Sequence, residues 1–248
     1  MREAMRRFFA AVDPGTELIV LDREESRHLA KVLRLQVGER IELFDGSGAL
    51  YTAKIESVGK RVAVRVTDRT AAPEKPGPLL IVCQGDLKGQ KIDFLVEKCT
   101  ELGVDRFIPF TAGRSQGRDD AERRSKKHHR RQTIVRTACK QCGRLRLMQV
   151  DADLEFRDLL RAQAAGEGCL KLMLWEQERG SMLGDAIGAG SFDHLFLMLG
   201  PEGGFSTAEA AQARAAGWLP VSLGERILRA ETAALAAVAI TQHLLGRM

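Results

Sequence analysis

The sequence lacks any apolar segment long enough to cross a membrane. Its longest uncharged apolar run, Ala233–Ile240, is far shorter than the roughly 20 residues that a bilayer-spanning helix needs. Near the N-terminus, Glu3 and Asp13 flank only a short apolar stretch, so no signal-peptide core is visible. We therefore expect a cytoplasmic protein.

Cysteine is sparse, and its spacing does not suggest a disulfide framework. The five cysteines are Cys83, Cys99, Cys139, Cys142 and Cys169. An odd, scattered set in a chain with no secretory signal favours reduced thiols. Cys139 and Cys142 have zinc-ligand spacing, with His128 and His129 nearby, but there is no second cysteine pair and the segment carries a helical pattern. We expect core packing there and no metal.

Two nucleotide fingerprints are also missing. The segment Gln84–Gly89 follows a predicted strand but lacks the glycine spacing of a dinucleotide-binding turn. No Walker-type run of glycine, lysine and serine or threonine occurs anywhere in the chain. These absences disfavour dehydrogenase and ATP-dependent classes.

Positive charge is concentrated in one segment. Residues 113–146 hold twelve Lys and Arg against three acids, although the whole chain has a net charge of only +5. Such a concentration suits a polyanionic partner, because each phosphate neutralised by Lys or Arg releases counterions. The alternative is a solvated helix face that happens to be basic.

The first 72 residues show the alternation of short strands. The predicted strands are Glu17–Leu21, Arg40–Phe44, Ala49–Ser57 and Arg61–Thr67. One helix interrupts them, with Ser26 as its predicted cap. Residues 73–78 contain three prolines, which disrupt regular structure. We therefore expect a small β-barrel over residues 1–72, a linker over 73–78 and a second domain over 79–248.

After the linker the pattern changes to apolar runs that alternate with helical segments. The predicted strands are Leu79–Cys83, Phe107–Phe110, Leu145–Val150, Leu170–Trp175, Leu195–Leu199 and Pro220–Leu223. A helix over Ile92–Leu102 is predicted between the first two, with Gly103 as its left-handed terminator. This order predicts an α/β domain with a mainly parallel sheet.

Two strand-to-helix loops are the best candidates for a ligand site. The first, Gly200–Gly204, is rich in glycine and precedes a capping box formed by Ser206 and Glu209. The second, Leu223–Arg229, leads into an alanine-rich helix. Loops at the ends of strands in one sheet can converge on one crevice. Ordinary turns remain the alternative for both.

Motifs that span nearly the whole chain carry a family resemblance: Arg7–Phe9, His28–Arg34, Lys91–Gly103, Arg114–Ser115, Gly200–Phe205 and Leu223–Ala233. On these residues the chain resembles the RsmE-type family of SPOUT methyltransferases. The last two motifs are the most specific. The resemblance implies a PUA-like β-barrel that binds RNA, followed by a SPOUT-type α/β domain with a C-terminal trefoil knot, and a homodimer. It also implies methylation of N3 of a uridine in 16S ribosomal RNA.

The resemblance and the loops together define three sets of expected site residues. Those expected to bind S-adenosylmethionine are Leu174, Leu199, Gly200, Pro201, Glu202, Gly203, Gly204, Leu223, Gly224, Arg226, Ile227 and Leu228. Those expected to bind RNA are Arg7, Arg27, His28, Arg34, Arg114, Arg123, Arg124, Lys126, Lys127 and Arg144. Arg229 is the candidate for stabilising the uracil anion, and Glu202 and Glu231 are candidates for handling its proton.

Two other interpretations remain open. A non-catalytic RNA-binding or ribosome-assembly protein would also use the barrel and the basic segment, but the intact glycine and arginine loops argue against it. A related knotted methyltransferase that acts at another RNA position is the second. The N-terminal part of the resemblance disfavours that alternative.

Overall fold

The computed structural model describes residues 5–13, 15–73, 77–113, 120–162, 168–188 and 190–248. The chain divides into two compact units. The first contains residues 1–75 together with Cys139–Leu147, and the second contains Pro76–Ala138 and Met148–Met248.

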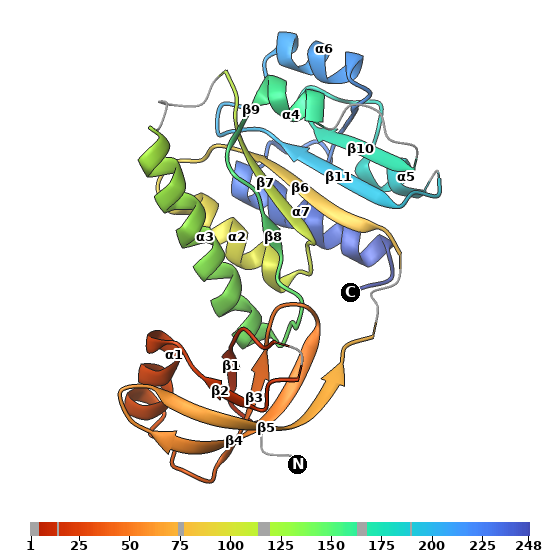
Figure 1. The fold of residues 1–248 in the computed structure, drawn as a ribbon. Helices are drawn as coiled ribbons and strands as arrows, with labels where there is room; N and C mark the ends of the chain where they lie inside the picture. Colours follow the sequence, from red (N-terminus) through yellow and green to blue (C-terminus); the bar gives the residue numbers. More distant parts are fainter. Residues whose placement is uncertain (1–4, 14, 74–76, 114–119, 163–167, 189) are drawn as a thin grey trace. The chain divides into compact units, whose positions relative to one another are not determined.

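The first unit is built on a five-stranded sheet (Figure 1, red to orange). Its strands are β1 (Arg7–Phe9), β2 (Leu18–Val20), β3 (Arg40–Phe44), β4 (Ala49–Val58) and β5 (Val62–Ala71), in the order β1-β3-β4-β5-β2. Neighbours are antiparallel except β1 and β3. Alternate residues such as Ile41 and Leu43, or Val62 and Val64, point into one apolar core. The expected strands are thus present, and β1 is an addition that the sequence pattern did not predict.

The helix of the first unit begins earlier than expected. Helix α1 (Arg23–Arg27) is capped by Asp22, whose side chain accepts a hydrogen bond from Glu25 N at 2.8 Å. The prediction that Ser26 caps this helix is therefore wrong. Ser26 is buried, and its hydroxyl donates to Leu21 O and accepts from Val62 N. The helix continues directly into one π-helical turn, η1 (His28–Val32).

The second unit contains a seven-stranded sheet in which every neighbouring pair is parallel. Its strands are β6 (Leu79–Gly85), β7 (Arg106–Thr111), β8 (Gln149–Val150), β9 (Leu154–Glu155), β10 (Cys169–Leu174), β11 (His194–Leu199) and β12 (Leu219–Val221). The order is β12-β10-β11-β6-β7-β8, and β9 also pairs with β7. The prediction of an α/β domain with a parallel sheet is confirmed.

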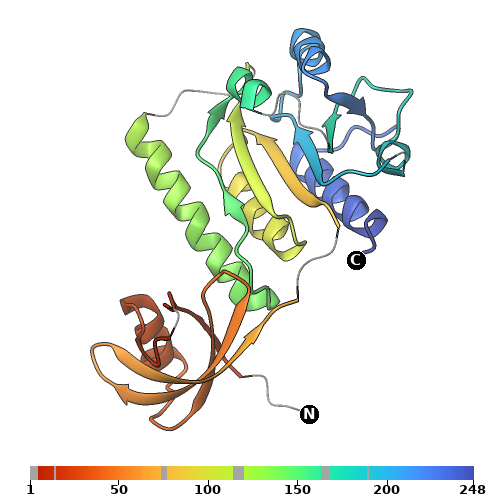
Figure 2. The same ribbon diagram turned by 45° about the vertical axis from the view of Figure 1, so that its right-hand side comes forward.

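Helices cover both faces of this sheet, as Figures 1 and 2 show. They are α2 (Lys91–Glu101), α3 (Ala121–Cys142), α4 (Phe156–Ala162), α5 (Leu183–Gly188), α6 (Thr207–Ala215) and α7 (Ala230–Leu244). On one face, α4 and α6 pack with Trp218 against alternate strand residues such as Ile81 and Phe196. Helices α2 and α7 lie side by side on the other face. Gly103, with a φ of 78°, ends α2 in the expected left-handed conformation.

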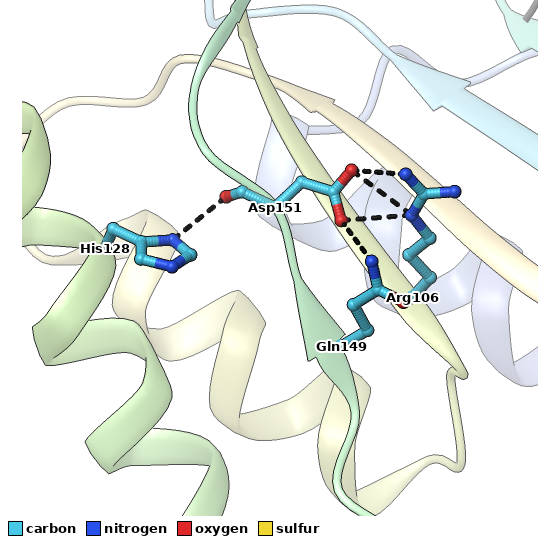
Figure 3. Close-up of polar contacts among 4 residues, drawn as sticks. All are labelled: Arg106, His128, Gln149 and Asp151. Carbon is cyan, nitrogen blue, oxygen red and sulfur yellow. Dashed lines mark hydrogen bonds and ion pairs between the residues drawn. The ribbon is translucent and has the colours of Figure 1, made fainter.

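Helix α3 is held to the sheet by side chains from its buried face. His128 Nδ1 lies 3.3 Å from the backbone oxygen of Asp151. The Asp151 carboxylate accepts hydrogen bonds from Arg106 on β7 and from Gln149 Nε2 at 3.0 Å (Figure 3). One turn further along, Arg131 pairs with Asp153. These contacts join α3 to the chain that runs from β8 to β9.

The segment after α3 differs from the predicted strand over Leu145–Val150. Only Gln149–Val150 forms β8. Leu147 N instead donates to Gly46 O at 3.1 Å, and Arg146 bridges to the same turn of the first unit, with which this segment is grouped. The sequence pattern predicted one strand over this segment, but the backbone partners change at Met148.

The five cysteines lie in different environments. Cys139 is buried and Cys142 is exposed in the last turn of α3, and none of the five thiols forms a disulfide. Within the part of the chain that the structure describes, no cluster of three or more His, Cys, Asp or Glu side chains is arranged to hold a metal ion. The described helices also include none that is long and apolar enough to span a bilayer.

Candidate active site

The first predicted loop is shaped by its glycines and by the strand next to it. β11 ends at Leu199, and Gly204 N donates to Pro201 O at 2.9 Å, with Gly204 at a φ of 65°. Gln84, fully buried on neighbouring β6, donates from Nε2 to Gly200 O at 3.0 Å. A Cβ atom on Gly85 would lie 2.6 Å from Pro201 N. The loop is therefore fixed from beneath by side-chain and backbone contacts with β6.

The helix after this loop starts as predicted. Ser206 accepts a hydrogen bond from Glu209 N at 3.2 Å, and Glu209 Oε2 accepts from Ser206 N at 2.8 Å, which makes a complete capping box for α6. The other Glu209 oxygen accepts from Gly113 N at 2.8 Å. One carboxylate therefore fixes both the start of α6 and the backbone just after β7.

The second predicted loop follows β12 and ends at α7. Gly224 has a φ of 122°, and its N–H donates to Ser222 Oγ at 3.1 Å. Arg229 is the N-cap residue of α7, with an extended backbone and an exposed side chain. Ile227 is 83% exposed, which is unusual for isoleucine. Such an apolar side chain at the mouth of a cavity suits contact with a ligand.

A third wall, which the sequence pattern did not predict, comes from the segment after β10. Trp175 N donates to Val221 O at 3.1 Å, and the Arg214 guanidinium lies 5.6 Å from the centre of the Trp175 ring. Trp175 Nε1 is buried, and none of the described residues accepts a hydrogen bond from it. Arg179 Nη1 donates to Glu176 O at 2.6 Å. These residues are hard to predict because they lie outside any glycine motif.

The three walls enclose one cavity of about 510 Å³. They meet because β10, β11 and β12 are parallel neighbours whose carboxyl ends reach the same edge of the sheet. The lining of this cavity includes every residue expected to bind the cofactor: Leu174, Leu199, Gly200, Pro201, Glu202, Gly203, Gly204, Leu223, Gly224, Arg226, Ile227 and Leu228. Arg229 and Glu231 line it too. The structure thus brings the predicted cofactor and catalytic residues together.

The cavity fits S-adenosylmethionine in size and in chemistry. Ligand pockets typically measure about 300–1,000 Å³. Leucine, isoleucine and tryptophan side chains offer apolar surface for an adenine ring, and the glycines expose backbone groups for its polar edge. Carboxylates such as Glu176 and cations such as Arg179 are available for the charged amino-acid part. Trp175 Nε1, which donates to none of the described residues, is a further donor for a bound ligand.

Lys91, at the start of α2, also lines the cavity and was not among the predicted site residues. Its Nζ lies 2.5 Å from Glu202 Oε1 and 3.5 Å from Glu231 Oε2. The hydrogen bond from Lys91 lowers the pKa of the Glu202 carboxyl below its usual range. The pKa of the Lys91 ammonium is raised in turn, chiefly by the same bond. The signal that pointed to Lys91 was its place at the start of a resemblance motif.

The residues expected to bind RNA in the first unit have different environments. Arg7 is tied to Glu42 by hydrogen bonds of 2.7 and 3.0 Å. Arg27 and Arg34 are exposed, and Arg34 has a φ of 55°. The His28 ring packs edge-on against Phe8, with 5.9 Å between ring centres. Arg144 Nε donates to Arg146 O at 2.6 Å.

In the second unit, Arg123, Arg124 and Lys126 on α3 are exposed and Lys127 is half-buried. Arg114 lies outside the described residues. Several neighbouring cations are committed to structure: Arg130 pairs with Asp93, and Arg131 is fully buried against Asp153. The basic count of the sequence therefore overstates the charge that this helix offers to a partner.

Comparison with known proteins places the chain in a class that agrees with this fold and cavity. The family model described as an RNA methyltransferase domain matches residues 73–242, and the model described as an RNA methyltransferase PUA domain matches residues 21–66. The chain therefore belongs to the RNA methyltransferase family with an N-terminal PUA-like domain.

Individual relatives narrow the class to ribosomal RNA small subunit methyltransferase E. The protein of that name from Mycobacterium bovis is 32% identical over 97% of this chain and 92% of its own length. The Bacillus subtilis protein is 30% identical over 89% of this chain and 88% of its own. A Neisseria gonorrhoeae methyltransferase E crystallised with S-adenosylmethionine is 34% identical, with a TM-score of 0.88 over 97% of this chain and 98% of its own.

Proposed function

We propose that this protein methylates N3 of a uridine in 16S ribosomal RNA, with S-adenosylmethionine as the methyl donor. The observation that carries the proposal is the single cavity formed by the Gly200–Gly204 and Leu223–Arg229 loops, which contains all the residues expected at a cofactor site. The full-length relatives named small subunit methyltransferase E support the RNA substrate. Such an enzyme works in the cytoplasm, where ribosomal subunits are assembled.

In this proposal the chain's own residues bind the donor and activate the acceptor. Bound S-adenosylmethionine supplies an electrophilic methyl group on a sulfonium. Leu174, Leu199 and Ile227 give apolar contact, and the glycine backbones give hydrogen bonds. Uracil N3 carries a proton, so the site must help to remove this proton or stabilise the anion that remains, and Glu202 and Glu231 are the candidate proton acceptors. Arg229, exposed at the N-terminus of α7, is the proposed anion-stabilising group.

We take residues 1–72 as the RNA-binding domain, 73–78 as a linker and 79–248 as the methyltransferase domain. Exposed Arg27 and Arg34 in the first, and Arg123 and Arg124 on α3, are the proposed phosphate contacts. We also infer that the C-terminal part of the second domain is a trefoil knot. The order β12-β10-β11, in which the last strand returns beside β10, is compatible with it.

A homodimer is part of the same proposal. Helix α7 has Glu231 as its only acidic or basic side chain apart from His243. It packs against α2, α5 and β11, yet Ile240 and Leu244, one turn apart, are 40% and 47% exposed. An apolar strip at this spacing suits a twofold contact, in which the same surface serves both subunits.

The function is tested by incubating the protein with undermethylated small ribosomal subunits and isotope-labelled S-adenosylmethionine. Mass spectrometry of the RNA nucleosides should then show label in 3-methyluridine. Label in a 2′-O-methylated nucleoside, or in another base, would replace the proposed position. Absence of label in any nucleoside, with cofactor binding intact, would favour a non-catalytic RNA-binding role.

A further inference from the structure

Lys91 connects both cofactor loops through one ammonium group. Glu202 lies in the loop after β11, and Glu231 lies in the first turn of α7. Both carboxylates contact Lys91 Nζ, at 2.5 and 3.5 Å. All three side chains line the cavity. A residue of α2 thereby joins the loop after β11 to the start of α7 at the wall of the cavity.

The two carboxylates are engaged to very different extents. Glu202 accepts a short hydrogen bond from the Lys91 side chain and another from the Lys88 backbone. The positive charge of Lys88 also stabilises the ionised Glu202 carboxylate. These contacts lower the pKa of Glu202. Glu231 Oε2, by contrast, is buried and lies 3.5 Å from Lys91 Nζ, so its contact with Lys91 is longer and weaker than that of Glu202.

This difference favours Glu231 over Glu202 as a proton acceptor. Hydrogen bonds to an ionised carboxylate stabilise the charged form and weaken it as a proton acceptor. Glu202 accepts hydrogen bonds from Lys91 and from the Lys88 backbone, whereas the contact of Glu231 with Lys91 is longer. Glu231 is also two residues from Arg229, the proposed anion-stabilising cation.

The charges around the cavity are balanced with Lys91 present. The other charged lining residues are Glu176, Arg179, Glu225, Arg226 and Arg229, and Lys88 acts on Glu202 from outside the lining. Removing Lys91 leaves an excess negative charge and two carboxylates without their shared cation. Like charges disfavour ionisation, so the pKa of Glu202 should then rise.

We propose that Lys91 is a positioning residue. Its ion pair with Glu202 holds that carboxylate in place and leaves Glu231 as the carboxylate that accepts the proton of the target base. The inference rests on the proposed function. In the step it describes, the N3 proton moves to Glu231 while the N–H bonding pair remains on nitrogen. That pair forms the new bond to the methyl carbon, and the pair of the broken carbon–sulfur bond stays on sulfur.

The positioning part is tested without RNA or cofactor, by carbon NMR titration of protein labelled at the glutamate carboxyls. The resonance that disappears in Glu202→Gln identifies Glu202. In Lys91→Met its pKa should rise from the lowered value, and Lys91→Arg should restore the lowered value. Because the wild-type pKa is lowered, the ion pair is present above the usual glutamate range and is lost as the pH falls through the lowered value. An unchanged Glu202 titration in Lys91→Met would show that Lys91 does not hold Glu202 through this ion pair.

The catalytic part is tested by single-turnover methylation of small subunits, with cofactor affinity measured separately by calorimetry. Glu231→Gln should reduce the rate constant by about 100-fold or more, the usual scale for losing a proton acceptor. Lys91→Met and Glu202→Gln should each reduce it by only about tenfold, the scale of one charged hydrogen bond. Lys98→Met is the matched control, because Lys98 lies on the same helix and pairs with Glu97 and Glu101 outside the cavity lining.

The outcomes separate the two proposals. A Glu231→Gln enzyme with the wild-type rate, or a greater loss in Glu202→Gln, would overturn the assignment of Glu231. If the wild-type protein transfers no methyl group to small-subunit RNA, the proposed function fails. The NMR titration still tests the ion pair between Lys91 and Glu202 in that case. Should Lys91→Met fold poorly, Glu202→Gln breaks the same ion pair from the other side, and the raised pKa of the Lys91 ammonium should then fall.

Discussion

Arg131 and Asp153 form a salt bridge of 3.0 Å in which the arginine side chain is completely buried. Arg131 Nε and Nη2 have no hydrogen-bond partner among the described residues. The guanidinium therefore depends on one carboxylate to offset the loss of its hydration. This pair, with the His128 contact, fixes α3 to the chain between β8 and β9.

Replacing Asp153 with alanine should lower the free energy of unfolding by about 3–5 kcal/mol, because it leaves a buried charge without its partner. Denaturant unfolding measures the loss. Asp158→Ala is the control, since Asp158 pairs with Arg161 on the surface at 3.7 Å and should cost less than about 1 kcal/mol. Equal losses in the two variants would mean that the Arg131 pair contributes no more than a surface contact.

The glycine loop should be sensitive to a change that lies outside the cavity. A Cβ at position 85 would meet Pro201 N at 2.6 Å and the carbonyl carbon of Gly200 at 2.9 Å. Gly85→Ala should therefore displace the loop and weaken S-adenosylmethionine binding at least about tenfold, which corresponds to about 1.4 kcal/mol. Calorimetric titration measures this. Gly188→Ala, where a Cβ has no neighbour within 4 Å, should bind normally.

The RNA proposal predicts a change in salt dependence. Replacing exposed Arg123 and Arg124 with alanine should weaken binding to small-subunit RNA and reduce the slope of log affinity against log salt by about 1.4–1.8, the effect of losing two phosphate contacts. Arg157 and Arg161 are exposed on α4 and serve as a matched control pair. If both double variants change the slope equally, the effect reflects net charge and not a binding surface on α3.

The dimer proposal is tested at Ile240. Light scattering of the wild-type protein should give about twice the single-chain mass of 27.3 kDa. Ile240→Asp should shift the mass toward one chain, because a charge in an apolar contact is costly. Val238 is unsuitable for this purpose, since it is completely buried within its own chain. A wild-type mass near 27.3 kDa would exclude the dimer.

The cysteines should differ in reactivity. Burial raises the pKa of Cys99 to about 12, and it raises the pKa of buried Cys83 as well. Both thiols are therefore protonated at pH 8 and inert toward Ellman's reagent, because the thiolate is the reactive form. Exposed Cys142 should react first in the native protein, and Cys142→Ser should remove that phase. Rapid labelling of Cys83 or Cys99 before unfolding would contradict the packing described above.

The amino-acid pattern alone predicted the class of the second unit and several of the elements in both units. Alternating apolar residues specify β3 and β4 because a strand exposes its two faces in turn, and the period of 3.6 specifies α2. Local chemistry also determined the capping box of α6 and the left-handed Gly103, since both depend on neighbours in sequence. The resemblance motifs then identified the two cofactor loops.

Tertiary structure decided the features that depend on residues distant in sequence. Ser26 and Asp22 are both good caps, and the burial of Ser26 against β5 decided between them. Which basic residues of α3 are free was decided by partners such as Asp93 and Asp153, which no charge count reveals. Likewise Lys91 joins Glu202 and Glu231 because the order of parallel strands brings the ends of β6 and β11 together beside α7. These ion pairs join side chains on different elements, which only the fold makes neighbours, so the sequence spacing could not predict them.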